Sequence, residues 1–244
     1  MTPPHFTLVV PAYNEEAFLP ALLDSVDVAR ARYHRGREAV QVVVADNAST
    51  DATAEIARRR GCEVVRESKR VIGAARNAGA RAARGEILAF VDADSRIHPE
   101  TFNAVERAMD SGRFVGGATG VRLERMSLGI AATVAAMLPM VWLTGMDTGV
   151  VFCRRRDFEA VGGYTEERLF AEDVKFLLDL RRLGRGGGRR LTRVRSAKAI
   201  ASTRKFDKYG EWHYFTLAGK LVVKEIFSRG SAEQHARRYW YDDR

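Results

Sequence analysis

Short apolar runs alternate with helical stretches along the first half of the chain. The four runs predicted to be buried strands are residues 6–12, 40–45, 62–67 and 86–91. After the first run, Leu19, Leu22 and Val26 recur at the three- or four-residue spacing that places side chains on one face of a helix. Strands that alternate with helices predict an α/β fold, in which a mostly parallel sheet is flanked by helices.

The second half is less regular, with strands predicted at 114–121, 149–154 and 191–195 and a leucine-rich helix between the last two. The sequence contains no internal repeat and no linker that would separate two domains. At 244 residues the chain is long enough to bury one sizeable core. We therefore expect a single domain over residues 1–244 with an elaborated C-terminal part.

Polar side chains gather where the predicted strands end. They are Tyr13, Asn14 and Glu15 after the first strand, Asp46 and Asn47 after the second, and Asp92 to Ser95 after the fourth. Open α/β sheets bind their ligands in the crevice at the carboxyl ends of the strands. The sequence therefore predicts a site at this edge of the sheet.

The segment Asp92-Ala93-Asp94 places two carboxylates one residue apart directly after a strand. Such a pair can converge on a hard cation, and Mg²⁺ or Mn²⁺ prefers oxygen ligands that it shares with substrate phosphates. A metal held there neutralises charge on a departing diphosphate. The alternative is that one aspartate caps a helix and the other lies in a solvated turn.

Two other groups carry candidate chemistry. Arg76 and Asn77 follow the third strand, where a guanidinium can bind phosphate in a forked geometry or simply face solvent. Glu172 and Asp173 precede the leucine-rich helix. One of them is a candidate general base, although acidic residues also favour the first turn of a helix for electrostatic reasons.

Composition and charge restrict the class and the location of the protein. The chain is 46% hydrophobic and 29% charged, which excludes wholesale disorder, and its net charge of +9 attracts phosphates, anionic membranes or nucleic acid. The N-terminus lacks the pattern of a signal peptide, which predicts a cytoplasmic location. The charge-free stretch between Arg125 and Asp147 contains Pro139, which favours a buried or interfacial helix over a membrane span.

Taken together, six motifs resemble those of family 2 glycosyltransferases, which are inverting nucleotide-sugar enzymes with the GT-A fold. The motifs are Pro11-Ala12-Tyr13-Asn14-Glu15-Glu16, Asp46-Asn47-Ala48-Ser49-Thr50-Asp51, Arg76-Asn77-Ala78-Gly79, Asp92-Ala93-Asp94-Ser95, Phe158-Glu159-Ala160-Val161-Gly162-Gly163-Tyr164 and Glu172-Asp173. They occur in the family's order. The QxxRW motif of the processive members is missing from the sequence, so we expect a nonprocessive enzyme that adds one sugar.

The resemblance implies a role for each motif residue. The residues expected to bind the nucleotide sugar are Pro11, Ala12, Tyr13, Glu15, Asp46, Asn47, Arg76, Asn77, Asp92, Ala93 and Arg204. Asp94 is the expected metal ligand, with Asp92 beside it, and Asp173 is the expected base, with Glu172 beside it. Residues 1–97 would form the nucleotide-binding half, and residues 98–244 the acceptor-binding half and tail.

The implied partners are a nucleoside-diphosphate sugar, a divalent cation, and an acceptor that is a sugar, a lipid-linked or envelope glycan, or a small molecule. Basic and apolar surface in the second half is compatible with peripheral contact at the inner face of a membrane. One competing hypothesis is a sugar nucleotidyltransferase, but those enzymes carry a basic, glycine-rich loop where this chain has the acidic PAYNEE. Another is a noncatalytic binder of anionic surfaces or nucleic acid, built on the arginines of 181–195. Acidic strand ends argue against nucleic acid.

Overall fold

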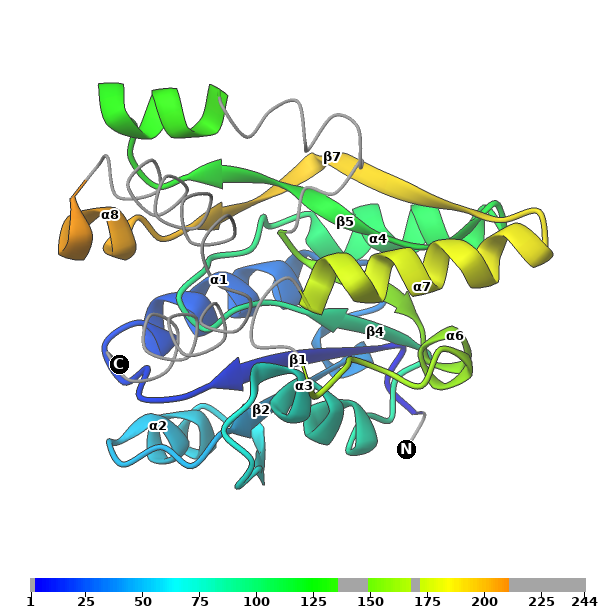
Figure 1. Cartoon of the computed structure of the whole chain (residues 1–244). Coiled ribbons are helices and arrows are strands. Elements are labelled where there is room, and N and C mark those ends of the chain that lie inside the picture. The colour runs from blue at the N-terminus through cyan, green and yellow to red at the C-terminus, as the bar shows by residue number, and fades with distance from the viewer. Residues whose placement is uncertain (1–2, 136–148, 168–171, 211–244) are drawn as a thin grey trace.

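The computed structural model describes residues 3–135, 149–167 and 172–210 (Figure 1). Seven strands form one sheet in the order β3-β2-β1-β4-β6-β5-β7. Their bounds are β1 Phe6–Ala12, β2 Val40–Asp46, β3 Glu63–Arg66, β4 Ile87–Phe90, β5 Phe114–Leu123, β6 Val151–Arg154 and β7 Arg190–Ala201. Only β6 runs antiparallel to its neighbours, so the prediction of a mostly parallel sheet is confirmed.

Helices cover both faces of this sheet. Their bounds are α1 Leu19–Arg32, α2 Thr53–Arg59, α3 Ile72–Arg81, α4 Thr101–Asp110, α6 Arg155–Ala160, α7 Glu172–Gly186 and α8 Arg204–Tyr209, with a 3-10 turn η1 at Arg37–Ala39. An unlabelled helix covers residues 128–135. In Figure 1, α7 lies across β5 and β7, and α3 lies across β1 and β2.

The alternation of side chains along β1 divides the interior into two cores. Phe6, Leu8 and Val10 point to the face covered by α1, α2 and α4. Val9 points to the opposite face, where it joins residues of α3 and α7 such as Ala80 and Phe176. Because successive strand residues face opposite sides, a strand buried on both faces is apolar throughout, as this one is.

The main departure from the sequence prediction lies at the far edge of the sheet. The last strand was expected over 191–195, but β7 runs twelve residues, Arg190–Ala201. It pairs in parallel with β5 as far as Leu123, with two register irregularities. Its many charged residues hid this length, since an edge strand exposes polar side chains that a search for apolar runs misses.

Helix α2 begins at Thr53, whose amide donates to Asp51 Oδ1 at 2.9 Å. Of the charge-free stretch, residues 128–135 are helical and 136–148 lie outside the described residues. None of the helices within the described ranges is long and apolar enough to cross a membrane.

Close packing of α3 on β1 depends on Gly79. A Cβ built there would lie 2.4 Å from Cγ1 of Val9, a buried and rotationally stiff side chain. We expect Gly79→Ala to lower the free energy of unfolding by about 1–3 kcal/mol because of overpacking. Gly186, at the end of α7, has nothing within 4 Å of the same position and is the matched control. Denaturant unfolding should show Gly186→Ala unchanged or stabilised by up to about 1 kcal/mol. Equal losses in the two variants would contradict the packing argument.

Candidate active site

Strands β1, β2 and β4 end at the same edge of the sheet, and hydrogen bonds tie the loops that follow them. Asn14 adopts a left-handed backbone conformation with φ 51°. Its amide donates to Ser49 Oγ at 3.1 Å, and its Oδ1 accepts from the Thr50 amide at 2.9 Å. Asparagine tolerates this conformation better than most residues do. The loops after β1 and β2 are therefore held together.

Asp46 and Asn47 organise the loops on the β2 side of this edge. Asp46 is buried, and its Oδ1 accepts from the Ser49 amide at 3.1 Å. Asn47 donates through Nδ2 to the carbonyls of Glu67 and Lys69 at 3.0 and 2.7 Å, which fixes the loop after β3. A cation–π contact adds a further tie in this region.

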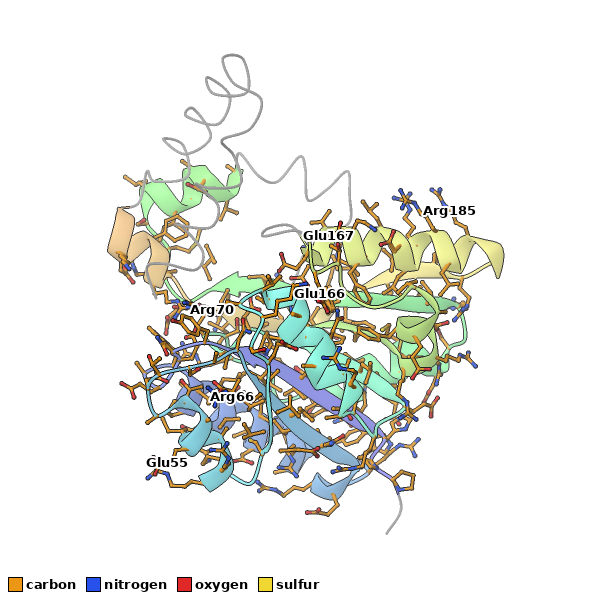
Figure 2. All side chains as sticks on the ribbon, turned by 60° about the horizontal axis from the view of Figure 1, so that its bottom comes forward. Glu55, Arg66, Arg70, Glu166, Glu167 and Arg185 are labelled. Carbon is orange, nitrogen blue, oxygen red and sulfur yellow. The ribbon has the colours of Figure 1, made fainter. Side chains whose placement is uncertain are left out.

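That contact joins the loops after β1 and β3. The Arg70 guanidinium carbon lies 4.1 Å from the centroid of the Tyr13 ring. Arg70 is exposed and Tyr13 is partly buried, so the pair lies at the surface of the strand edge. Figure 2 shows Arg70 on the same side of the molecule as Glu166.

Each aspartate of the Asp92-Ala93-Asp94 segment contacts an arginine. Asp92 Oδ1 lies 2.9 Å from Arg76 Nη2, and Asp94 Oδ2 lies 2.9 Å from Arg204 Nε. The Asp92 side chain is 53% exposed and that of Asp94 is 19% exposed. Both carboxylates therefore reach solvent beside a positive charge.

Arg204, at the start of α8, links the C-terminal part of the described chain to the loop after β1. Its two terminal nitrogens donate to both carboxylate oxygens of Glu15 at 2.7 and 2.8 Å. Its guanidinium carbon also lies 4.7 Å from the centroid of the Phe18 ring. Glu15 is only 1% exposed, so this forked pair is largely removed from water. Two residues that were both expected to bind the donor thus bind each other, and contact of either with the donor stays a prediction.

Arg76 is a second deeply buried charge in the site, with a side chain that is 3% exposed. Besides contacting Asp92, its Nη1 lies 2.7 Å from Glu172 Oε1 and 3.0 Å from Asp173 Oδ1. One guanidinium therefore joins the loop after β4 to the first turn of α7. The forked group that was expected to bind phosphate is already engaged by three carboxylates, and its role as a donor ligand stays a prediction.

Asp173 has an unusual proton affinity. Burial raises its pKa to about 6, and the negative charges of Glu172 and Asp92 act in the same direction. The Arg76 guanidinium opposes this rise. A carboxyl group with a pKa near neutrality can accept a proton and release it again, which is what a general base requires.

The donor set at the strand edge fits a divalent cation that is shared with a substrate. Asp92 and Asp94 supply carboxylate oxygens, and no third His, Cys, Asp or Glu joins them into a metal-binding group within the described ranges. Mg²⁺ commonly binds through one or two carboxylates and completes its shell with water and phosphate oxygens.

Sequence reasoning missed the contacts between Glu166 and residues Lys69 and Asn77. Asn77 donates through Nδ2 to the Tyr164 carbonyl at 2.9 Å and to Glu166 Oε1 at 3.0 Å. Lys69 Nζ lies 2.9 Å from Glu166 Oε2. The Asn77 amide is therefore used structurally, and its expected contact with the nucleotide sugar stays a prediction. A contact between residues 97 positions apart leaves no signal in one sequence.

The family is decided by the sequence match. The Glycosyl transferase family 2 model matches residues 7–128, which is half of the 244-residue chain. The chain belongs to glycosyl transferase family 2. The family that the motifs suggested is thereby confirmed, and the four motifs between Pro11 and Ser95 lie within the matched range.

Among curated relatives of this family 2 chain, an uncharacterised glycosyltransferase of Mycobacterium tuberculosis is 35% identical over 106 residues, covering 43% of this chain and 44% of the relative. An undecaprenyl-phosphate 4-deoxy-4-formamido-L-arabinose transferase of Pseudomonas paraeruginosa is 38% identical over 118 residues, covering 45% of this chain and 34% of the relative. The matched part thus spans less than half of either relative.

Solved structures support the GT-A fold of the chain. TarS 1-349 of S. aureus, in complex with UDP-GlcNAc, superposes with a TM-score of 0.63 at 21% identity, covering 97% of this chain and 70% of TarS. The mannosyltransferase PcManGT from Pyrobaculum calidifontis, with GDP-Man and Mn²⁺, gives 0.63 at 24% identity, covering 82% of this chain and 57% of that one. At these identities the likeness shows the fold alone.

Removing the Arg76 charge tests how much this guanidinium stabilises the fold. We expect Arg76→Met to lower the free energy of unfolding by about 3–5 kcal/mol near neutral pH, because three acidic groups lose their buried cation. The pKa of Asp173 already lies above its unfolded value and would rise further, so protonation as pH falls through about 6 relieves the repulsion. The deficit should therefore shrink between about pH 7.5 and about pH 5 in urea unfolding.

The control for this variant is Arg182→Met, which removes a pair between Asp179 and an arginine that is 72% exposed. Arg182→Met should change the free energy of unfolding by no more than about 0.5 kcal/mol at either pH. A deficit of Arg76→Met that is the same at both pH values would mean that carboxylate repulsion is not its source.

Proposed function

We propose that the protein transfers one sugar from a nucleoside-diphosphate sugar to an acceptor hydroxyl with the help of a divalent cation, and that the configuration at the anomeric carbon inverts. The observation that carries this proposal is the Arg76 cluster. It holds Asp173, a carboxyl group that is 20% exposed and has a raised pKa, beside the Asp92-Ala93-Asp94 segment. A base and a metal-binding pair are thus neighbours at one sheet edge.

The reaction is a single displacement. The Asp173 carboxylate takes the proton of the acceptor hydroxyl, whose oxygen forms a bond to the anomeric carbon. The bond from that carbon to the diphosphate oxygen breaks, and the diphosphate leaves with the electron pair. Attack on the face opposite the leaving group inverts the configuration.

Asp94 is the direct metal ligand in this proposal, with Asp92 beside it. When bound, the cation supplies charge neutralisation at the departing diphosphate. The Mn²⁺ in the mannosyltransferase structure supports the use of a divalent cation. Pro11, Ala12, Tyr13, Asp46 and Ala93 line the nucleotide, because they lie in or directly after the strands whose ends form the site.

The acceptor is a lipid-linked or cell-envelope glycan, and the enzyme works on it at the inner face of a membrane. Support comes from the Pseudomonas relative, whose name gives it an undecaprenyl-phosphate substrate, and from the net charge of +9, which favours an anionic surface. A noncatalytic anionic-surface binder remains the competing function, and the first experiment below separates the two.

Donor binding should depend on metal. Thermal unfolding with UDP, GDP, dTDP, CDP or ADP, each with and without Mn²⁺, should show one diphosphate that stabilises the protein only when Mn²⁺ is present. At about 100 times its dissociation constant, a ligand contributes about 2.7 kcal/mol. Asp94→Asn should abolish this shift, while Asp179→Asn, whose carboxylate pairs with Lys175 and Arg182 within α7, should retain it. If no diphosphate gives a metal-dependent shift, the noncatalytic binder is favoured.

Transfer should depend on the Asp173 carboxylate. We expect Asp173→Asn to lower kcat by about 10²- to 10⁴-fold while diphosphate binding is kept, since an amide cannot accept the proton. The wild-type rate should fall as pH drops through about 6, where the carboxylate becomes protonated. Release of nucleoside diphosphate from UDP-GlcNAc or GDP-mannose measures both effects. If Asp173→Asn turns over at the wild-type rate, Asp173 is not the general base.

A further inference from the structure

Tyr164 lies in the loop between α6 and α7, and the Asn77 side chain binds both its backbone amide and its backbone carbonyl. Its amide donates to Asn77 Oδ1 at 2.9 Å, and its carbonyl accepts from Asn77 Nδ2 at 2.9 Å. The next residue, Thr165, packs its carbonyl against Gly73, where a Cβ would approach it to 2.4 Å. The position of Tyr164 relative to α3 is therefore closely determined.

The ring of Tyr164 is packed as a phenylalanine ring would be. It stacks on Phe176 at 4.3 Å between centroids and meets the edge of Phe90 at 5.1 Å. The Arg76 guanidinium carbon lies 5.0 Å from its centroid. None of these contacts needs the hydroxyl, and burying a hydroxyl without a good partner is unfavourable. Packing alone thus does not account for a tyrosine at a position that is 2% exposed.

The neighbour that does account for the hydroxyl is Asp173. Neither the Tyr164 hydroxyl nor Asp173 Oδ1 makes a hydrogen bond of standard geometry within the described part of the chain. Both groups adjoin the Arg76 guanidinium, whose carbon lies 5.0 Å from the Tyr164 ring centroid and whose Nη1 lies 3.0 Å from Asp173 Oδ1. The hydroxyl also acts to lower the pKa of the Asp173 carboxyl group, as a hydrogen-bond donor does. Among the described residues, the charged groups that face Asp173 are the Arg76 guanidinium from α3, Glu172 from α7 and Asp92 from the loop after β4. In this set, Tyr164 is the neutral donor.

We propose that Tyr164 is a positioning residue, whose hydroxyl donates a hydrogen bond to the Asp173 carboxylate and orients it toward the acceptor. The inference rests on the proposed role of Asp173 as base. Arg76 alone does not fix the carboxylate, because it is shared with Glu172 and Asp92. A second donor from a rigid loop restricts the rotation of the carboxylate.

The direct test is Tyr164→Phe, which removes the hydroxyl and keeps the ring. Tyr33→Phe is the matched control, since Tyr33 also has a buried hydroxyl without a standard hydrogen bond and also packs on two phenylalanines. Carbon-13 NMR of labelled aspartate carboxyls follows the titration of Asp173 in the free protein, and Asp173→Asn identifies its signal. This measurement needs neither donor nor acceptor.

We expect the Asp173 titration to move to higher pH in Tyr164→Phe and to stay unchanged in Tyr33→Phe. Hydrolysis of UDP-GlcNAc, or of GDP-mannose if the diphosphate panel selects GDP, should show kcat reduced roughly tenfold, with diphosphate affinity kept. An unchanged Asp173 titration overturns the proposal, whether or not kcat falls. Failure of the base assignment itself is separate, because it would appear as turnover retained in Asp173→Asn.

A second measurement does not depend on the folding of Tyr164→Phe. Incorporation of 3-fluorotyrosine makes every tyrosine hydroxyl more acidic and therefore a stronger hydrogen-bond donor. The Asp173 titration should then move to lower pH in the otherwise unaltered protein and in Tyr33→Phe. If the Asp173 titration does not move on fluorination, the proposal is overturned, just as it is by an unchanged Asp173 titration in Tyr164→Phe.

Discussion

The buried guanidinium of Arg76 is the interaction on which the geometry of the site depends. A charge that is 3% exposed is costly unless it is fully paired, and here three carboxylates from two separate segments pair with it. Asp92 follows β4, while Glu172 and Asp173 begin α7. The same contact therefore holds the loop after β4 and the first turn of α7 at a set separation, because neither can move away without leaving a buried charge unpaired.

Arg204 performs a comparable task at the other end of the strand edge. It binds Glu15 with both terminal nitrogens and Asp94 with Nε, and so it connects α8 to the loops after β1 and β4. Each aspartate of the candidate metal pair thus contacts its own arginine. A divalent cation bound to this pair, as proposed, would compete with these arginines and would couple metal binding to the position of α8.

Much of this arrangement could be predicted from the sequence, and the remainder could not, for identifiable reasons. The apolar runs of β1, β2 and β4 are long and buried on both faces, so their pattern is unambiguous. The length of β7 was missed because its exposed arginines and lysine break the apolar pattern. Arg76 was correctly singled out, but its burial depends on α7 folding back over β5, which no local pattern reports.

The sequence by itself determined the fold class, the family and the edge of the sheet at which the polar residues meet, because strand alternation and motif order are properties of neighbouring residues. Only the tertiary structure decided which charges pair. Glu15 and Arg204 lie 189 positions apart, and Asn77 and Tyr164 lie 87 apart, and their contacts are made only once the chain has closed. The physical reason is that burial and charge pairing depend on distances in space, and a single sequence carries no direct record of those distances.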